Sequence, residues 1–419
     1  MKTKVICVGI KNQSTDLFEK AMEELRQLCH ANDMEVVASF QQVLASENSS
    51  TYLGSGKIEE IKLFCEEEEV DTVVTLHDLS PSQLRNLDEA LDLAVFDRTS
   101  IILNIFASRA KSKEAKLQVD LARLQYELPR MIGSYEALSR QAGSSGSMRS
   151  RGTGETKLEM DRRHLQGRIQ EMKKELESIK AQRAVQRRRR SKQGLFHVAL
   201  VGYTNAGKST LMNQLLSMSK LKQNEKEVWV FDQLFATLDT SVRRLEIEGY
   251  PPLLCSDTVG FVQDLPTTLI EAFHSTLEEA IEADVLLHVV DFSDENYSHH
   301  IKVTRDTLKV IQADAPEILV LNKTDQTNAV VTNNGDVRVY ISALTGLGMD
   351  ELMKRIFEVL FRHGRNFQCM VPYHDAQDYF LMKVHGLLQE DVKTDAGYRI
   401  SGKFTQEVWS LCEKHKVKQ

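Results

Sequence analysis

A run of small and polar residues that follows a short apolar segment has the residue types needed to bind phosphate groups. The apolar segment is residues 197–201, and a helix-forming LMNQLL follows the run. Backbone N–H groups in such a loop surround phosphates at a helix N-terminus, a lysine supplies charge to the β- and γ-phosphates, and a hydroxyl binds magnesium. The run fits the pattern G-x-x-x-x-G-K-S with Gly202, Tyr203, Thr204, Asn205, Ala206, Gly207, Lys208, Ser209 and Thr210. Because strand, loop and helix come in the required order, we predict a nucleotide site here rather than a chance turn.

A second apolar run, residues 252–256, ends in a motif that complements the phosphate loop. This D-x-x-G motif consists of Asp257, Thr258, Val259 and Gly260. We expect Asp257 to hold magnesium through a water molecule and the Gly260 N–H to contact the γ-phosphate. Four residues alone would equally fit a surface turn, but the position 55 residues after Gly202 (257 − 202) favours the nucleotide-binding interpretation.

Two further motifs have the groups that would read a guanine base. One follows the apolar run 317–321 and the other follows residues 337–341; they are Asn322, Lys323, Thr324 and Asp325, and then Ser342, Ala343 and Leu344. The Asp325 carboxylate can accept hydrogen bonds from the guanine ring N–H and exocyclic amine, whereas adenine lacks that amine. We expect a backbone N–H of the second motif to reach the guanine carbonyl oxygen. Either motif alone would fit an ordinary loop, but four motifs in order after four apolar runs predict a GTPase of the phosphate-loop class.

The segment between the first two motifs contains a candidate for the second magnesium ligand. Its residues are Phe235, Ala236, Thr237, Leu238 and Asp239. We interpret Thr237, a hydroxyl in a mainly apolar loop, as part of a switch that becomes ordered when the γ-phosphate is present. The alternative is a threonine within a strand. Lys208, Thr237 and Gly260 are therefore the predicted catalytic groups, and Mg²⁺, held by Ser209 and Thr237, is the predicted cofactor.

The residue after Gly260 is Phe261, at the position where Ras-like enzymes have the glutamine that orients the attacking water. Gln263 is nearby, but its displacement by two residues favours a solvated loop side chain. The sequence therefore predicts slow intrinsic hydrolysis that a partner accelerates.

The elements that position these residues indicate an α/β chain of several domains. A length of 419 residues is enough for two to four domains at roughly 100–200 residues each. In residues 1–108 apolar runs at 5–9, 34–40 and 70–76 alternate with helical patterns at 16–29, 57–68 and 81–91. This alternation predicts an N-terminal parallel α/β domain.

Residues 109–193 have a different pattern, which predicts an antiparallel helical hairpin. Leucines at 117, 121, 124 and 128, and apolar residues at 165, 169, 172, 176 and 179, follow heptad spacing. Glycines and serines from Ala142 to Gly154 disfavour helix and predict a tip loop. Gly194 marks the next boundary, so we expect a GTPase domain with a mostly parallel sheet at 194–364 and a small α+β domain at 365–419.

Charge and hydropathy restrict the partners. The net charge of −7 gives no overall attraction to nucleic acid, but two local basic clusters fit RNA phosphates. They are Arg149 and Arg151 in the tip loop, and Arg187, Arg188, Arg189 and Arg190 at the end of the second helix. A solvated helix end is the alternative for the second cluster. A stretch of about 18 apolar residues is absent, and the start lacks a signal sequence, so we expect a cytoplasmic monomer without integral membrane association.

Several longer motifs lie outside the nucleotide site: YLGSGKIEEI (52–61), PSQLRNL (81–87), DRTSIILNIFASRA (97–110), LQVDLARLQYELPR (117–130) and RGTGETKLEMDRR (151–163). With these motifs the chain resembles the HflX family of ribosome-associated GTPases, in the translation-factor-related Obg–HflX-like superfamily. The resemblance implies binding to the large ribosomal subunit and its rRNA, with the tip loop near the peptidyl-transferase centre, and splitting of stalled or idle ribosomes. It also implies a role in the stress response, and some members are linked to antibiotic resistance.

Two features leave alternatives open. The tip loop is about three residues longer than the glycine-rich turn typical of the family, so its reach and any effect on ribosome-targeting drugs could differ. Gly54, Ser55, Gly56 and Lys57 resemble the end of a phosphate loop, although the turn that begins a helix is the favoured interpretation. A ribosome-assembly GTPase and an ATP-dependent rRNA remodeller working through the N-terminal domain therefore remain alternative functions.

Overall fold

The described part of the chain comprises residues 2–12, 15–142, 151–191, 194–220, 235, 241–262, 274–327 and 338–417 of a computed structural model. It divides into two units, one ending at Ile179 and one beginning at Lys180, and each is considered by itself. This division falls within a helix, so the boundaries at 108, 193 and 364 stay predictions. In the described residues no helix combines the length and apolar character needed to cross a bilayer.

The N-terminal sheet of the first unit has four parallel strands in the order β2-β1-β3-β4. The strands are β1 (Thr3–Lys11), β2 (Met34–Val43), β3 (Thr72–Thr75) and β4 (Ala94–Asp97). Residues of α2 (Ser55–Glu68) and α3 (Pro81–Leu91) pack into the core on one face, and α1 (Thr15–Ala31) contacts β1 and α4 (Arg98–Arg109).

Local sequence signals explain where these helices begin. The Ser80 side chain accepts from Gln83 N at 3.2 Å while Gln83 Oε1 accepts from Ser80 N at 3.0 Å, and Pro81 occupies the first turn, so α3 has a capping box. Asp97 caps α4 through the Ser100 N–H. The alternation predicted from the sequence stopped short of β4 and α4, because a strand of four residues that passes directly into a helix has too little periodicity to detect.

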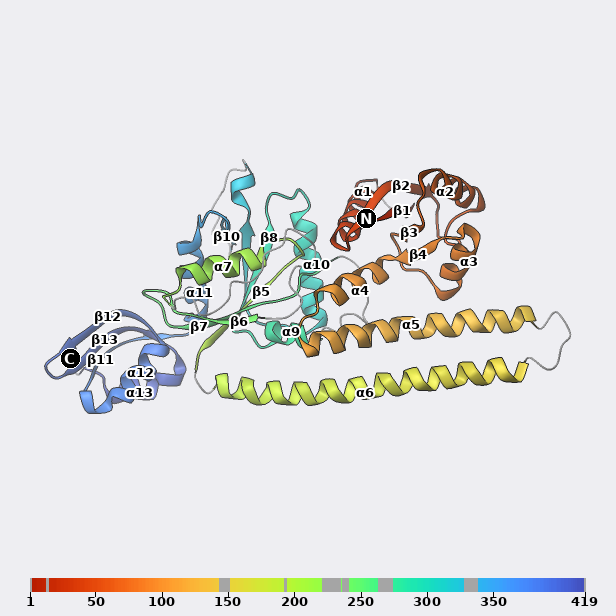
Figure 1. Cartoon of the computed structure of the whole chain (residues 1–419). Coiled ribbons are helices and arrows are strands. Elements are labelled where there is room, and N and C mark those ends of the chain that lie inside the picture. Colours follow the sequence, from red (N-terminus) through yellow and green to blue (C-terminus); the bar gives the residue numbers. More distant parts are fainter. Residues whose placement is uncertain are drawn as a thin grey trace. The chain divides into compact units, whose positions relative to one another are not determined.

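The predicted helical hairpin consists of α5 (Lys113–Ala142) and α6 (Arg151–Ser191), drawn side by side in Figure 1. Leu121 packs with Ile169 and Leu176, and Lys113 at the start of α5 pairs with Glu175 at 2.5 Å, as an antiparallel pair requires. One expectation was wrong: residues 151–154 belong to the first turn of α6 rather than to the tip loop. A glycine costs about 1 kcal/mol within a helix, which a long helix tolerates near its end. The rest of the tip, residues 143–150, lies outside the described residues.

A six-stranded sheet in the order β10-β9-β8-β5-β7-β6 forms the centre of the second unit. Its strands are β5 (Phe196–Val201), β6 (Ser241–Leu245), β7 (Leu253–Asp257), β8 (Val285–Asp291), β9 (Glu317–Asn322) and β10 (Arg338–Tyr340). All neighbours are parallel except β6 and β7. Helices α7 (Lys208–Met218) and α11 (Met349–Leu360) pack into the core on one face, and α10 (Tyr297–Val310) packs on the other; α9 (His274–Ile281) contacts β5. The predicted fold class is confirmed.

The C-terminal part has a three-stranded antiparallel sheet in the order β11-β13-β12, covered by two helices. The elements are β11 (Arg365–Val371), α12 (Ala376–Val384), β12 (Gly386–Thr394), β13 (Gly397–Phe404) and α13 (Trp409–Lys414). Helix α12 ends at Val384, and residues 386–388 pair with β13. Two carboxylates and an imidazole of the kinds that bind metal ions lie close together here, from Asp375, Asp378 and His415. The Lys414 ammonium pairs with the two carboxylates at 3.1 and 2.8 Å, so the group is an ion-pair cluster.

Candidate nucleotide-binding site

The phosphate loop connects β5 to α7, and two glycines give it a shape that other residues would not allow. Gly202 has a φ of +146°, and a Cβ there would lie 2.1 Å from the Val289 carbonyl oxygen of β8. Gly207 has a φ of +92°, and a Cβ there would lie 2.3 Å from Asn322 Nδ2. Both positions combine left-handed backbone with close approach, so they require glycine. The loop therefore lies against β8 and the base-reading motif.

Lys208 is the first residue of α7 and is buried. Its ammonium donates to the carbonyl oxygens of Gly202 at 3.1 Å and Tyr203 at 2.8 Å. Burial lowers the pKa of Lys208 to about 8, although the Asp257 carboxylate acts in the opposite direction. Negatively charged phosphate oxygens would stabilise the positive charge of this buried ammonium. This is the expected property of a phosphate-binding lysine.

Ser209, one of the two predicted magnesium ligands, lies beside Asp257, which we expect to hold the ion through water. Asp257 ends β7, which pairs with β5, and Ser209 lies in the first turn of α7. The Ser209 hydroxyl donates to Asp257 Oδ2 at 2.7 Å. A hydroxyl and a carboxylate beside a phosphate loop are hard oxygen donors of the kind that Mg²⁺ prefers. The residues present therefore fit the predicted ion.

The segment after Asp257 is attached to the phosphate loop through its backbone. Phe261 N donates to the Gly202 carbonyl at 3.1 Å, and Thr204 N donates to the Phe261 carbonyl at 2.7 Å. A Cβ at Gly260 would lie 3.0 Å from Lys208 Nζ, so the Gly260 backbone borders the phosphate position. The Phe261 ring is buried, with 2% of its surface exposed. The ring has no polar atom, so it cannot orient a water molecule by a hydrogen bond.

The base-reading motif joins three parts of the fold. Asn322 Nδ2 donates to the Ala206 carbonyl at 2.9 Å, and Ala343 N donates to Asn322 Oδ1 at 2.9 Å. Lys323 has a φ of +63°, and its ammonium pairs with Asp291 Oδ2 at 2.7 Å. Asp325 lies in the 3-10 helix η1 (Thr324–Gln326) with its side chain exposed. Asn322 therefore has a structural role, and Asp325 is the side chain available to a base.

Some of the remaining predicted residues are buried, one is exposed, and others lie outside the described residues. Thr258 is buried and donates to the Leu200 carbonyl at 2.6 Å, and Phe235 is buried. Ser342 N donates to the Leu347 carbonyl at 3.0 Å, whereas Leu344 is 72% exposed. The residues outside the described part are Ala236, Thr237, Leu238, Asp239 and Arg149, and the side chains of Arg151, Arg187, Arg188, Arg189 and Arg190 are not described either.

Two groups near the site were not predicted. Asp291 ends β8 beside Asn322, and the only signal for it was the acidic residue after an apolar run. The Tyr203 ring stacks on His300 of α10, with ring centroids 4.1 Å apart and planes at 13°. This contact joins the phosphate loop to a helix almost 100 residues further along the chain, so no local pattern could reveal it.

A glycine-containing loop between β5 and α7, a buried lysine and a serine–aspartate hydrogen bond on a mostly parallel sheet are together typical of a phosphate-loop GTPase. The protein hydrolyses GTP. Three protein-family models match it: GTP-binding GTPase N-terminal over residues 19–107, GTP-binding GTPase Middle Region over 109–190, and 50S ribosome-binding GTPase over 197–323.

Curated relatives define the family further. GTPase HflX of Caldanaerobacter subterraneus subsp. tengcongensis is 40% identical over 409 residues, which cover 97% of this chain and 92% of the relative. GTPase HflX of Alkalihalophilus pseudofirmus is 47% identical over 324 residues, 77% and 74% of the two chains. A crystal structure of a GTP-binding protein from Sulfolobus solfataricus in complex with GDP aligns with 25% identity and a TM-score of 0.45, over 86% of this chain and 99% of that one. The protein belongs to the HflX family of GTPases.

Proposed function

We propose that this GTPase binds the large ribosomal subunit through rRNA and uses GTP to split stalled or idle ribosomes in the cytoplasm. The observation that carries the proposal is the match of residues 197–323 to the 50S ribosome-binding GTPase model. The buried Phe261 supports it, because an apolar ring occupies the position at which Ras-like enzymes have the water-orienting glutamine, and a partner could supply that group.

The chain's own residues suggest how the site would treat GTP. The Lys208 ammonium would exchange the carbonyl oxygens of Gly202 and Tyr203 for β- and γ-phosphate oxygens. The Gly260 N–H would donate to the γ-phosphate. Ser209 and Asp257, joined by Thr237, would hold Mg²⁺, which supplies positive charge against the charge that develops on the transferred phosphoryl group.

The guanine base would lie against the residues after β9 and β10. The Asp325 carboxylate would accept from the ring N–H and the amine. The Ser342 N–H donates to the Leu347 carbonyl and the Ala343 N–H donates to Asn322 Oδ1. We therefore assign the Leu344 N–H to the guanine carbonyl oxygen.

An ATP-using remodeller is less well supported. Gly54 N donates to Gln42 Oε1 at 3.0 Å, and Lys57 pairs with Glu60 at 2.7 Å within the first turns of α2. These groups therefore complete a helix start, as favoured from the sequence, instead of facing a phosphate position. A GTPase that assists ribosome assembly without splitting remains the closer alternative.

Co-sedimentation with purified large subunits tests the proposal. We expect the protein to sediment with the subunits in the presence of a non-hydrolysable GTP analogue and much less with GDP. Lys208→Ala is the control that should abolish the nucleotide dependence, because it removes the phosphate-binding ammonium. Equal binding in both nucleotide states, or none, would refute the proposal.

A further inference from the structure

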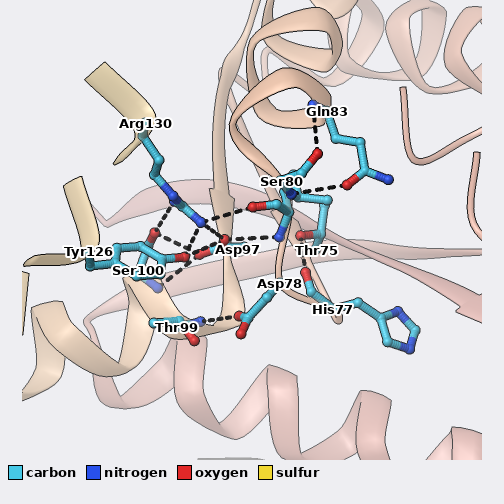
Figure 2. A network of polar contacts seen from close by, with 11 residues as sticks. Thr75, His77, Asp78, Ser80, Gln83, Asp97, Thr99, Ser100, Tyr126 and Arg130 are labelled. Carbon is cyan, nitrogen blue, oxygen red and sulfur yellow. Dashed lines mark hydrogen bonds and ion pairs between the residues drawn. The ribbon is translucent and has the colours of Figure 1, made fainter. Parts of the chain in front are cut away.

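Asp97, Tyr126 and Arg130 form a buried polar cluster, called here the clasp, at the carboxyl edge of the N-terminal sheet (Figure 2). Asp97 ends β4 and is completely buried. Tyr126 and Arg130 lie one turn apart on α5, and Figure 2 shows both side chains directed at the Asp97 carboxylate. The clasp therefore joins the hairpin to the N-terminal domain.

Both oxygens of the Asp97 carboxylate accept hydrogen bonds. Oδ1 accepts from the Ser100 N–H at 3.0 Å and the Ser100 hydroxyl at 2.7 Å. Oδ2 accepts from Leu79 N at 3.2 Å and from both α5 side chains. Burial opposes ionisation, but Arg130, Tyr126 and Ser100 together hold the pKa of Asp97 below its usual value. The clasp is thus a charged pair with its hydrogen bonds satisfied.

Arg130 is itself fixed in more than one direction. Its guanidinium carbon lies 3.7 Å from the centre of the Tyr126 ring, and Nη2 also donates to the Leu79 carbonyl at 3.2 Å. A planar guanidinium held by a ring face, a carboxylate and a carbonyl has little freedom to turn. The clasp therefore fixes an orientation as well as a position.

The simpler explanation is that apolar packing fixes α5 and the clasp only neutralises a buried charge. Packing is incomplete at this point, however. A cavity of about 410 Å³ lies between apolar side chains of the domain, among them Leu84, Phe96 and Leu103, and the α5 residues Tyr126 and Arg130. The hollow is open to solvent, and the polar contacts of Tyr126 and Arg130 join α5 to the domain beside it.

The backbone hydrogen bonding of α5 is also interrupted at this point. Pro129 lies inside α5, next to Arg130. It has no N–H to donate to the carbonyl of Gln125, and a proline within a helix commonly bends it. Without the clasp, α5 would lie beside the open hollow and would also lack the backbone hydrogen bond that Pro129 cannot form.

We propose that the clasp sets the direction in which the hairpin tip projects, so that Asp97, Tyr126 and Arg130 are positioning residues for the ribosome contact. This inference rests on the proposed function. The end of α5 at Ala142 lies about 12 residues beyond Arg130, or roughly 18 Å of helix, so a tilt of about 10° would move it by about 3 Å. Such a displacement equals the length of a whole hydrogen bond.

The direction of the hairpin can be measured in the full-length protein with two spin labels. Leu63 on α2 and Met160 on α6 are 62% and 64% exposed, and all six native cysteines are buried, so cysteines introduced at these two positions would be labelled selectively. The test variants are Arg130→Met and Tyr126→Phe. Arg123→Met is the matched control, because Arg123 also lies on α5 and pairs with Glu127 four residues on, outside the clasp.

We expect a narrow distance distribution in the parent and in Arg123→Met, a clearly broader distribution in Arg130→Met, and a smaller broadening in Tyr126→Phe. Ribosome-stimulated hydrolysis should fall by at least about tenfold in Arg130→Met while GTP binding without ribosomes is unchanged, because misplacement by ångströms is enough to lose a productive geometry. Thermal unfolding of each variant shows that it is folded.

Each other outcome is decisive. A narrow distribution in folded Arg130→Met overturns the inference, whatever the ribosome data. A broad distribution with full ribosome stimulation overturns the positioning role. If the parent does not bind ribosomes at all, the proposed function and the positioning role built on it both fail, while the distances still decide whether the clasp fixes the hairpin.

Discussion

Replacing Asp325 with asparagine is the perturbation that tests the nucleotide specificity most sharply. The Asp325 side chain is exposed in η1, so the change should leave the fold intact. The carboxylate offers two acceptors to the two guanine donors, whereas an amide offers one acceptor and one donor. Asp325→Asn therefore loses one hydrogen bond and sets an amide N–H₂ against the guanine amine.

The size of the effect follows from these two changes. A hydrogen bond to a charged group contributes about 1.5–3 kcal/mol, and leaving a donor unpaired adds a further cost. We expect a loss of about 3 kcal/mol or more, which is on the order of 100-fold in affinity for GTP. Xanthine has a carbonyl where guanine has the amine, so the same variant should bind xanthosine triphosphate better than GTP.

Direct calorimetric titrations of each protein with GTP and with xanthosine triphosphate give both affinities. The matched control is Asp306→Asn, a similar change at an aspartate of α10 that pairs with Lys309 at 3.4 Å. It should leave GTP and xanthosine triphosphate affinities as in the parent. If Asp325→Asn binds GTP as tightly as the parent, Asp325 does not read the base and the assignment is wrong.

Four further predictions concern the phosphate site, the rate of hydrolysis and the hairpin. Because the pKa of Lys208 is lowered to about 8, its ammonium is lost as the pH rises through that value, so GTP affinity should weaken about fourfold from pH 7 to pH 8.5; a flat profile in nucleotide titrations would contradict this. Hydrolysis by the purified protein should be slow and rise at least about tenfold with large subunits, and fast turnover without ribosomes would exclude a partner-dependent mechanism. Shortening the tip between Ala142 and Arg151 should spare GTP binding yet reduce ribosome splitting, and with it any protection against drugs bound near the peptidyl-transferase centre. Arg149→Ala with Arg151→Ala should flatten the salt dependence of ribosome binding by about one log–log unit per lost phosphate contact; an unchanged slope would move the RNA contact to residues 187–190.

The nucleotide site was predictable because each of its motifs follows a strand. Parallel strands bring their carboxyl ends to one edge of the sheet, so Lys208, Asp257 and Asn322 had to come together once the strands were recognised. The hairpin was equally accessible, since Leu121 and Ile169 follow heptad spacing. These features are local patterns, and local patterns are what a sequence displays.

The features that were missed depend on contacts between distant residues. The clasp joins Asp97 to residues 29 and 33 positions later, and neither Tyr126 nor Arg130 departs from an ordinary helical pattern. Residues 386–388 continue the apolar pattern of α12, and only their pairing with β13 makes them a strand. In both places tertiary contact overrides local preference.

The central claim is that GTP binding by this protein separates ribosomal subunits, and sedimentation of 70S ribosomes tests it most directly. Ribosomes would be incubated with the protein and GTP, with GDP, or with the Lys208→Ala variant and GTP, and then resolved on a sucrose gradient. The account predicts that 70S particles convert to free subunits only with the parent protein and GTP, with the protein in the large-subunit fraction. A 70S peak that stays intact while the protein binds the large subunit would contradict splitting and favour the assembly alternative.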